Sequence, residues 1–146
     1  MRIITTTFSI PCRDINGWHL GVAYYMGPEW ADPKTIQRWP GKMGHEIRNK
    51  VETSVSYSLS TGRLSSWGFL CNPDGDQYEY NSLFKLHLDP SHEDTADDAP
   101  TIEEAQRWYQ DYLSCLYSYI IKFFKETTAR FDSKKVEYVF SLLSAH

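Results

Sequence analysis

Hydrophobic and polar side chains alternate with a helical period in Thr101–Thr128, and this pattern predicts one long amphipathic helix. Thr101 and Glu104 have the spacing of a capping box, which satisfies two backbone N–H groups at a helix start. The expected buried face comprises Ala105, Trp108, Tyr112, Leu116, Ile120 and Phe123. The expected polar face comprises Glu103, Arg107, Gln110, Ser114, Ser118 and Lys122. We therefore expect a helix that builds the core and carries no chemistry.

Two further pairs of apolar runs predict β-hairpins. In the first, Leu20–Met26 is a strand that ends at Gly27-Pro28, and Thr35–Trp39 is its partner. In the second, Val51–Tyr57 alternates apolar and polar side chains, and Leu64–Leu70 returns after a turn that contains Gly62. Both pairs predict antiparallel pairing.

Three other segments complete the expected fold. Met1–Arg13 has strand character through its isoleucines and threonines, but Pro11 would interrupt the ladder. The four apolar residues of Tyr80–Leu88 predict a short helix under the sheet. Val136–Leu143 is nearly continuous in apolar residues, which is typical of a buried parallel strand. The sequence thus predicts a single α/β domain over residues 1–146 with an unfinished sheet.

Composition narrows the function classes. The net charge of −4 provides no basic field for nucleic acid or an anionic membrane. Cys12, Cys71 and Cys115 are odd in number and lack zinc-site spacing, so a reduced cytoplasmic setting is expected, without a metal site. There is no secretory signal, transmembrane run, Walker-type loop or dinucleotide glycine fingerprint. Composition alone therefore assigns no chemistry.

An ordered set of short motifs resembles one family. The motifs are Gly21-Val22-Ala23-Tyr24-Tyr25, Trp39-Pro40-Gly41, Val51–Tyr57, Trp67-Gly68-Phe69, Phe84-Lys85-Leu86, Trp108, Asp111-Tyr112-Leu113 and Val136–Ser141. In this order and spacing, residues 21–141 resemble the fungal-type branch of the 70-kDa heat-shock chaperones, in the actin-like ATPase superfamily. The resemblance implies a truncated first lobe of an ATPase domain with a ribonuclease-H-like fold. In the parent family, ATP and Mg²⁺ bind between two such lobes.

The resemblance also implies positions for phosphate contacts. The family carries a loop of the form Asp-x-Gly-Thr-Thr before the Gly-Val-Ala strand, which places Asp14 at the aspartate, Asn16 at the glycine, and Gly17 and Trp18 at the threonines. Lys85 takes the place of the family's phosphate-facing lysine. By pattern alone, Lys85 is a surface lysine on a short amphipathic helix.

The phosphate loop departs from the family pattern. Such a loop needs small residues so that backbone N–H groups can approach the phosphate oxygens, and the Trp18 side chain would fill that space. We therefore expect a degenerate lobe that binds neither ATP nor Mg²⁺ and does not hydrolyse ATP by itself. The alternative is a non-catalytic module that keeps the lobe's fold. It would bind a protein partner, or a second copy of itself, through an uncovered sheet edge.

Overall fold

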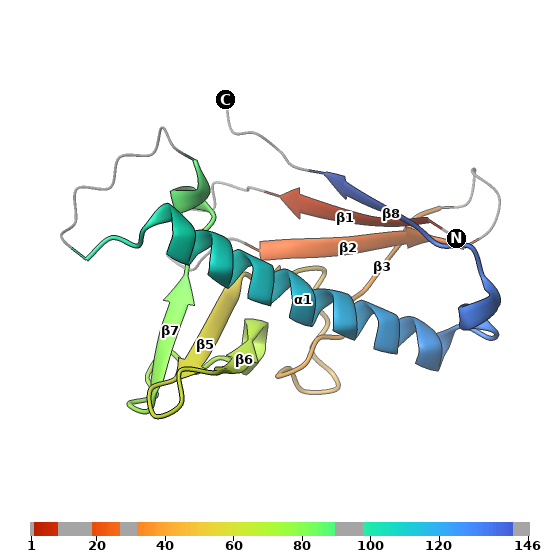
Figure 1. Ribbon diagram of the computed structural model, residues 1–146. Coiled ribbons are helices and arrows are strands. Elements are labelled where there is room, and N and C mark those ends of the chain that lie inside the picture. The colour runs from red at the N-terminus through yellow and green to blue at the C-terminus, as the bar shows by residue number, and fades with distance from the viewer. Residues whose placement is uncertain (1, 9–18, 27–31, 90–97, 142–146) are drawn as a thin grey trace.

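The computed structural model describes residues 2–8, 19–26, 32–89 and 98–141, and it has two sheets and one long helix (Figure 1). The strands of the first sheet are β1 (Arg2–Phe8), β2 (His19–Tyr25), β3 (Lys34–Thr35), β4 (Val51–Glu52) and β8 (Glu137–Ser141). The second sheet contains β5 (Ser54–Ser58), β6 (Leu64–Trp67) and β7 (Tyr78–Ser82). The helix α1 (Ile102–Thr127) lies across both sheets, and short 3₁₀ turns are η1 (Gly68–Leu70), η2 (Leu86–Leu88) and η3 (Phe131–Ser133). The mixed α/β class expected from the sequence is confirmed.

The first sheet has the order β3-β2-β1-β8, and β4 also pairs with β2. β1 and β2 are antiparallel from Arg2 opposite Tyr25 to Phe8 opposite His19. The strand β8 runs parallel to β1, as expected. It lies at the edge of this sheet, however, and Tyr138 and Val139 are half-buried, so the expectation of a fully buried strand is wrong. Among the described strands, only β1 pairs with β8, so β8 is covered less than a central strand would be.

The second sheet has the order β6-β5-β7, with antiparallel pairs throughout. The β5–β6 pair confirms the second expected hairpin. The continuous strand expected over Val51–Tyr57 is instead two strands, because the chain leaves the first sheet after Glu52 and enters the second at Ser54. Thr53 is buried at this crossing. The side chains before and after Thr53 are both largely buried. The hydrophobic pattern of the sequence is therefore the same on either side of the break and does not mark it.

One other sequence expectation is wrong, and another is confirmed only in part. Tyr80–Leu88 does not form a helix: Tyr78–Ser82 is the strand β7, which pairs with β5, and only Leu86–Leu88 forms a 3₁₀ turn. Pairing with a strand distant in sequence outweighs the local helical pattern here. The first hairpin exists, but its second strand is only Lys34–Thr35, and the chain continues from there without regular structure to the buried Trp39.

Helix α1 begins as its sequence predicts. The Glu104 backbone N–H donates to Thr101 Oγ1 at 3.2 Å, and the Thr101 backbone N–H donates to Glu104 Oε2 at 2.9 Å. The bond from the Thr101 N–H, together with one that the Thr101 hydroxyl donates to Glu104 Oε2 at 3.0 Å, lowers the pKa of Glu104. The buried positions are Ala105, Tyr112, Leu116, Ile120 and Phe124. Phe124, and not the expected Phe123, ends the buried face, because a spacing of four positions from Ile120 keeps the side chain on the same side.

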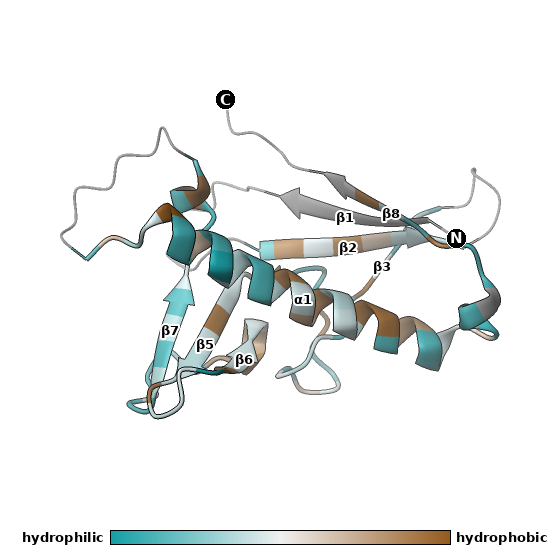
Figure 2. Ribbon diagram, in the orientation of Figure 1, coloured by the Kyte–Doolittle hydropathy of each residue, from teal (hydrophilic) through white to brown (hydrophobic). Residues whose placement is uncertain are grey.

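The core lies between α1 and the two sheets (Figure 2). Toward the C-terminal end of α1, the ring of Phe124 packs edge-on against Tyr24 of β2, with ring centroids 4.9 Å apart. Nearer its N-terminal end, Tyr112 packs against Trp67 of β6 at 5.8 Å. None of the described helices is both long and apolar enough to cross a membrane.

Candidate functional site

The two sheets meet at one place, where several strand ends come together. β4 pairs with the start of β2, with Glu52 opposite His19. Two residues later, β5 begins at Ser54, which is opposite Ser82, the last residue of β7. The end of the β1–β2 pair that contains His19 and the end of β7 are therefore joined by residues 52–54. We call this region, with Glu52, Thr53, Tyr80, Leu83–Lys85, Tyr109 and Tyr112, the sheet junction.

The chain turns sharply as it leaves β7. Leu83 has φ +58°, a left-handed conformation that is uncommon for a leucine and costs of order 1–3 kcal/mol. The next residue, Phe84, is fully buried, and its ring lies 6.3 Å from the rings of Trp108, Tyr109 and Tyr112 in α1. The packing of Phe84 thus fixes the direction in which the side chain of Lys85 extends from the backbone.

Lys85 carries the most unusual charge of the described chain. Its Nζ atom is buried and has no hydrogen-bond partner. The atom lies 5.6 Å from the centroid of the Tyr109 ring, within the range of a cation–π contact. Burial lowers the pKa of Lys85 to about 8, so most molecules still carry the charge at pH 7. The expectation of a surface lysine on a helix is therefore wrong, since the residue follows a strand and its ammonium group is covered.

Other polar atoms of the sheet junction are buried as well. The Tyr80 hydroxyl donates to Glu52 Oε1 at 2.6 Å, and burial together with this carboxylate raises the pKa of Tyr80 to about 12. The Thr53 and Tyr112 hydroxyls are buried close to each other, and neither makes a hydrogen bond of good geometry. An unsatisfied buried polar group typically costs about 1–3 kcal/mol. The sheet junction therefore concentrates polar groups whose bonding capacity is unused in this structure.

The geometry can provide a positive charge and neutral hydroxyl groups to an anion. A buried, unpaired ammonium group gains most from a charge-assisted hydrogen bond, because little water is present to compete for it. The nearby carboxylate of Glu52 already accepts a hydrogen bond from Tyr80. In the described part of the chain, no group of three or more His, Cys, Asp or Glu side chains is placed to hold a metal ion.

The residues expected from the sequence have different outcomes. Asp14, Asn16, Gly17 and Trp18 lie outside the described residues, between Phe8 and His19. Phe8 and His19 are paired, so the described ends of that segment lie where β4 joins β2.

Sequence reasoning missed the other residues of the sheet junction. Tyr109 lies between Trp108 and Gln110 on the helix, and nothing in its spacing marks it as a contact of a lysine. Glu52 and Tyr80 are far apart in the sequence, and only the pairing of β5 with β7 brings them together. The one available signal was a lysine inside an apolar run.

Comparison with protein-family models, with curated proteins and with solved structures gave no match for this chain.

Proposed function

We propose that this chain is one lobe of an actin-like ATPase domain of the 70-kDa heat-shock type, in which Lys85 contacts the phosphates of a nucleotide. The observation that carries the proposal is the buried Nζ atom of Lys85, which has no hydrogen-bond partner at the sheet junction. An unpaired buried ammonium group destabilises the fold, which favours a functional reason for its presence. The sequence resemblance assigns a phosphate contact to this residue.

The topology is consistent with this proposal. An antiparallel unit β1–β2–β3 is followed, after the long helix, by a strand that pairs in parallel with β1. This arrangement supports a ribonuclease-H-like lobe. The phosphate loop expected at Asp14, Asn16 and Gly17 would lie between β1 and β2, whose paired end adjoins the sheet junction.

A nucleotide bound here would supply phosphate oxygens that carry negative charge. Lys85 would donate to one of these oxygens, and the anion would raise the pKa of Lys85 back toward its ordinary value. Hydrolysis needs more, because the leaving phosphate must be stabilised from several sides and a water molecule must be positioned. With Asn16, Gly17 and Trp18 in place of a glycine and two threonines, we expect weak binding by the isolated lobe and no turnover.

The burial of Lys85 changes the expectation for nucleotide affinity. An exposed lysine contributes at most about 1 kcal/mol to binding. The ammonium group observed here is already desolvated, so its hydrogen bond with a phosphate falls in the range of about 1.5–3 kcal/mol. Together with the hydroxyl groups of the junction, this supports a Kd near 1 mM, or about 4 kcal/mol, and not tight binding.

The test is a calorimetric titration of Mg-ATP, run beside a phosphate-release assay. Wild type should bind at about millimolar Kd without release of phosphate. Lys85→Met should bind at least tenfold more weakly. Lys122→Met is the matched control, since this lysine is exposed on the polar face of α1 and its side chain is 72% accessible. Equal affinities in wild type and Lys85→Met would refute the proposal, and turnover would refute the inactive lobe.

A second candidate is the non-catalytic interaction module, with a second copy of this chain as the partner. Beside α1 is a hollow of about 470 Å³, lined in part by Leu88, Tyr109, Leu113 and Tyr117. The exposed Tyr117 ring lies 5.6 Å from the ring of Tyr138 in the edge strand β8. A sheet edge can template pairing with a strand of another molecule, and the aromatic side chains beside it would be covered in the same contact.

Light scattering over a wide concentration range, with and without Mg-ATP, separates the two candidates. Self-association that is unaffected by nucleotide and lost in Tyr117→Lys would support the interaction module. A monomer at all concentrations would exclude the second-copy form of it.

A further inference from the structure

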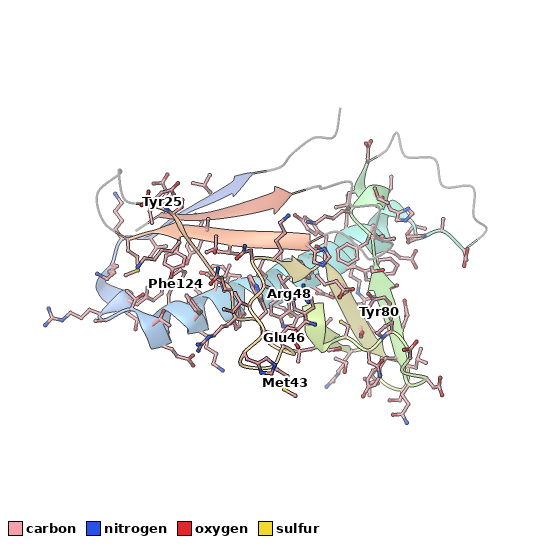
Figure 3. The ribbon with its side chains drawn as sticks, turned by 180° about the vertical axis from the view of Figure 1, so that it is seen from behind. Tyr25, Met43, Glu46, Arg48, Tyr80 and Phe124 are labelled. Carbon is pink, nitrogen blue, oxygen red and sulfur yellow. The ribbon has the colours of Figure 1, made fainter. Side chains whose placement is uncertain are left out.

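A second hollow, apart from Lys85, is lined mainly by cationic and polar side chains. It has a volume of about 420 Å³, and its lining residues are His19, Lys42, Arg48, Asn49, Lys50, Glu52 and Phe69. Three of these side chains are cationic and one is a carboxylate, although the chain as a whole has a net charge of −4. Figure 3 shows that Arg48 and Glu46 lie on the loop between β3 and β4. This local excess of positive charge runs against the overall composition.

The loop that carries these cations is held by several hydrogen bonds. The Trp39 indole Nε1–H donates to the carbonyl of Arg48 at 2.9 Å. The Arg48 backbone N–H donates to the carbonyl of Gln37 at 3.0 Å, and the Gln37 side-chain amide donates to Asn49 Oδ1 at 2.9 Å. Since Trp39 is buried in the core, these bonds fix the backbone of Arg48 and Asn49 relative to the sheets. The backbone on this side of the hollow is therefore held in place, and the Arg48 side chain extends from it as an exposed group.

The other side of the hollow depends on a glycine. Gly41 has φ +86°, and a Cβ atom there would lie 2.5 Å from the carbonyl oxygen of Phe69. Only glycine permits this close approach of the loop to Phe69. The approach brings Lys42 Nζ to 4.6 Å from the centroid of the Phe69 ring. The same ammonium group lies 3.6 Å from Glu46 Oε2.

Two carboxylates near the hollow already have partners. Glu46 pairs with Lys42, and Glu52 accepts the hydrogen bond of Tyr80. The guanidinium group of Arg48 has no ion pair with any described residue. Arginine presents a planar set of donors that matches the oxygens of phosphate. The volume exceeds what a bare phosphate ion fills, so an organic group could be bound with it.

We propose that this hollow binds a phosphate monoester, with Arg48 as the principal donor and Lys42, Lys50 and the Asn49 amide around the same anion. Two or more positive charges at one place favour a dianion over a single carboxylate. Lys85 does not line this hollow, and the inference does not rest on the proposed nucleotide contact.

The experiment is an NMR titration of the ¹⁵N-labelled chain with phosphoserine, inorganic phosphate and acetate at constant ionic strength. The backbone signals of Arg48, Asn49 and Phe69 should shift with phosphoserine at low millimolar concentration, and with acetate at least tenfold less. Arg48→Gln should weaken the response at least tenfold. Arg63→Gln, an exposed change in the β5–β6 turn, should leave it unaltered.

Lys85→Met separates this site from the sheet junction, because it should leave the phosphoserine response intact. The titration with inorganic phosphate distinguishes a phosphate monoester from free phosphate as the ligand. A weaker response than that of phosphoserine supports a monoester, whereas an equal response would reduce the site to one for free phosphate and overturn the monoester. Equal responses to acetate, an equal loss in Arg63→Gln, or no shift would overturn the proposal. If Arg48→Gln does not fold, Lys42→Gln takes its place with the same expectation.

Discussion

The two halves of helix α1 rest on different kinds of surface. The C-terminal half packs on the first sheet through aromatic and aliphatic contacts, with Phe124 between Tyr24 and Phe131. The N-terminal half packs on the second sheet beside Lys85, whose buried Nζ atom has no hydrogen-bond partner, and beside the buried hydroxyls of Thr53 and Tyr112. Among the described residues, Thr128 at the helix end has a similarly unpaired hydroxyl, but no charge. The C-terminal half therefore stabilises the fold through apolar packing. The N-terminal half contains buried polar groups that lower the stability, at the place where we propose a ligand.

Leu116 lies in the middle of the buried face, and its replacement should affect both halves. Leu116→Asp places a carboxylate where the side chain is 1% exposed, and we expect a loss of about 4 kcal/mol or more in the free energy of unfolding. Ser118→Asp, on the exposed face, should cost less than about 0.5 kcal/mol. Urea unfolding of both variants measures this. Similar losses would show that the buried face is wrongly assigned.

In the apolar half, Phe124→Ala should destabilise the fold by about 3–5 kcal/mol, because it removes a fully buried ring. Phe123→Ala is the matched control, since the neighbouring ring is only half-buried. Thermal unfolding of the two variants compares them directly. A larger loss of stability in Phe123→Ala than in Phe124→Ala would contradict the assignment of Phe124 as the buried ring of the apolar half.

In the polar half, Lys85→Met should stabilise the fold at pH 7 by up to about 3 kcal/mol, because it replaces a buried charged side chain by an uncharged one of similar length. The pKa of Lys85 falls from 10.5 in the unfolded chain to about 8 in the fold, so the unfolded state binds more protons between these values. The destabilising effect of Lys85 is thus complete below pH 8 and disappears as the pH rises to 10.5.

The pH series should be measured as the difference between wild type and Lys85→Met, since this cancels the titration of the tyrosines. The stability advantage of the variant should shrink steadily above pH 8. A difference that stays constant from pH 7 to pH 10 would mean that Lys85 is not desolvated. Lys122→Met should show no such trend.

The smallest expected effect concerns a hydrogen bond at the rim of the polar half. The Tyr57 hydroxyl donates to Asp111 Oδ2 at 2.6 Å, and burial and the carboxylate together raise the pKa of Tyr57. Tyr57→Phe should cost about 1.5–2 kcal/mol, as expected for a hydrogen bond to a charged acceptor. Chemical denaturation measures the cost. A neutral result would indicate that water replaces the hydroxyl group without loss.

The sequence predicted the features that depend on local spacing. The cap at Thr101 and most of the buried face of α1 follow from residues three or four positions apart, and the structure confirms them. The break at Thr53 and the strand β7 depend on pairings between distant segments, such as Ser54 with Ser82. No local pattern reports such a pairing, and β7 was therefore expected as a helix.

The candidate site was predictable only in part. The resemblance selected Lys85, but its burial results from the turn at Leu83 and the packing of Phe84 beneath α1. These features combine a strained backbone with contacts across the fold. The cationic hollow was missed because Lys42, Arg48 and Lys50 are spaced along an irregular loop, and only the fold places them beside His19 and Phe69.

The parallel pairing of β1 with β8 has a consequence for the order in which the protein is made. Arg2 lies opposite Glu137, so the first sheet joins the first and last described strands. During synthesis, the second sheet and its hairpin can form from neighbouring segments while β1 still lacks this partner. Long-range parallel pairing is slow to form, and an uncovered strand edge invites other chains. The nascent chain therefore lacks this partner of β1 until β8 has been translated, and an unpaired strand edge favours aggregation in that interval.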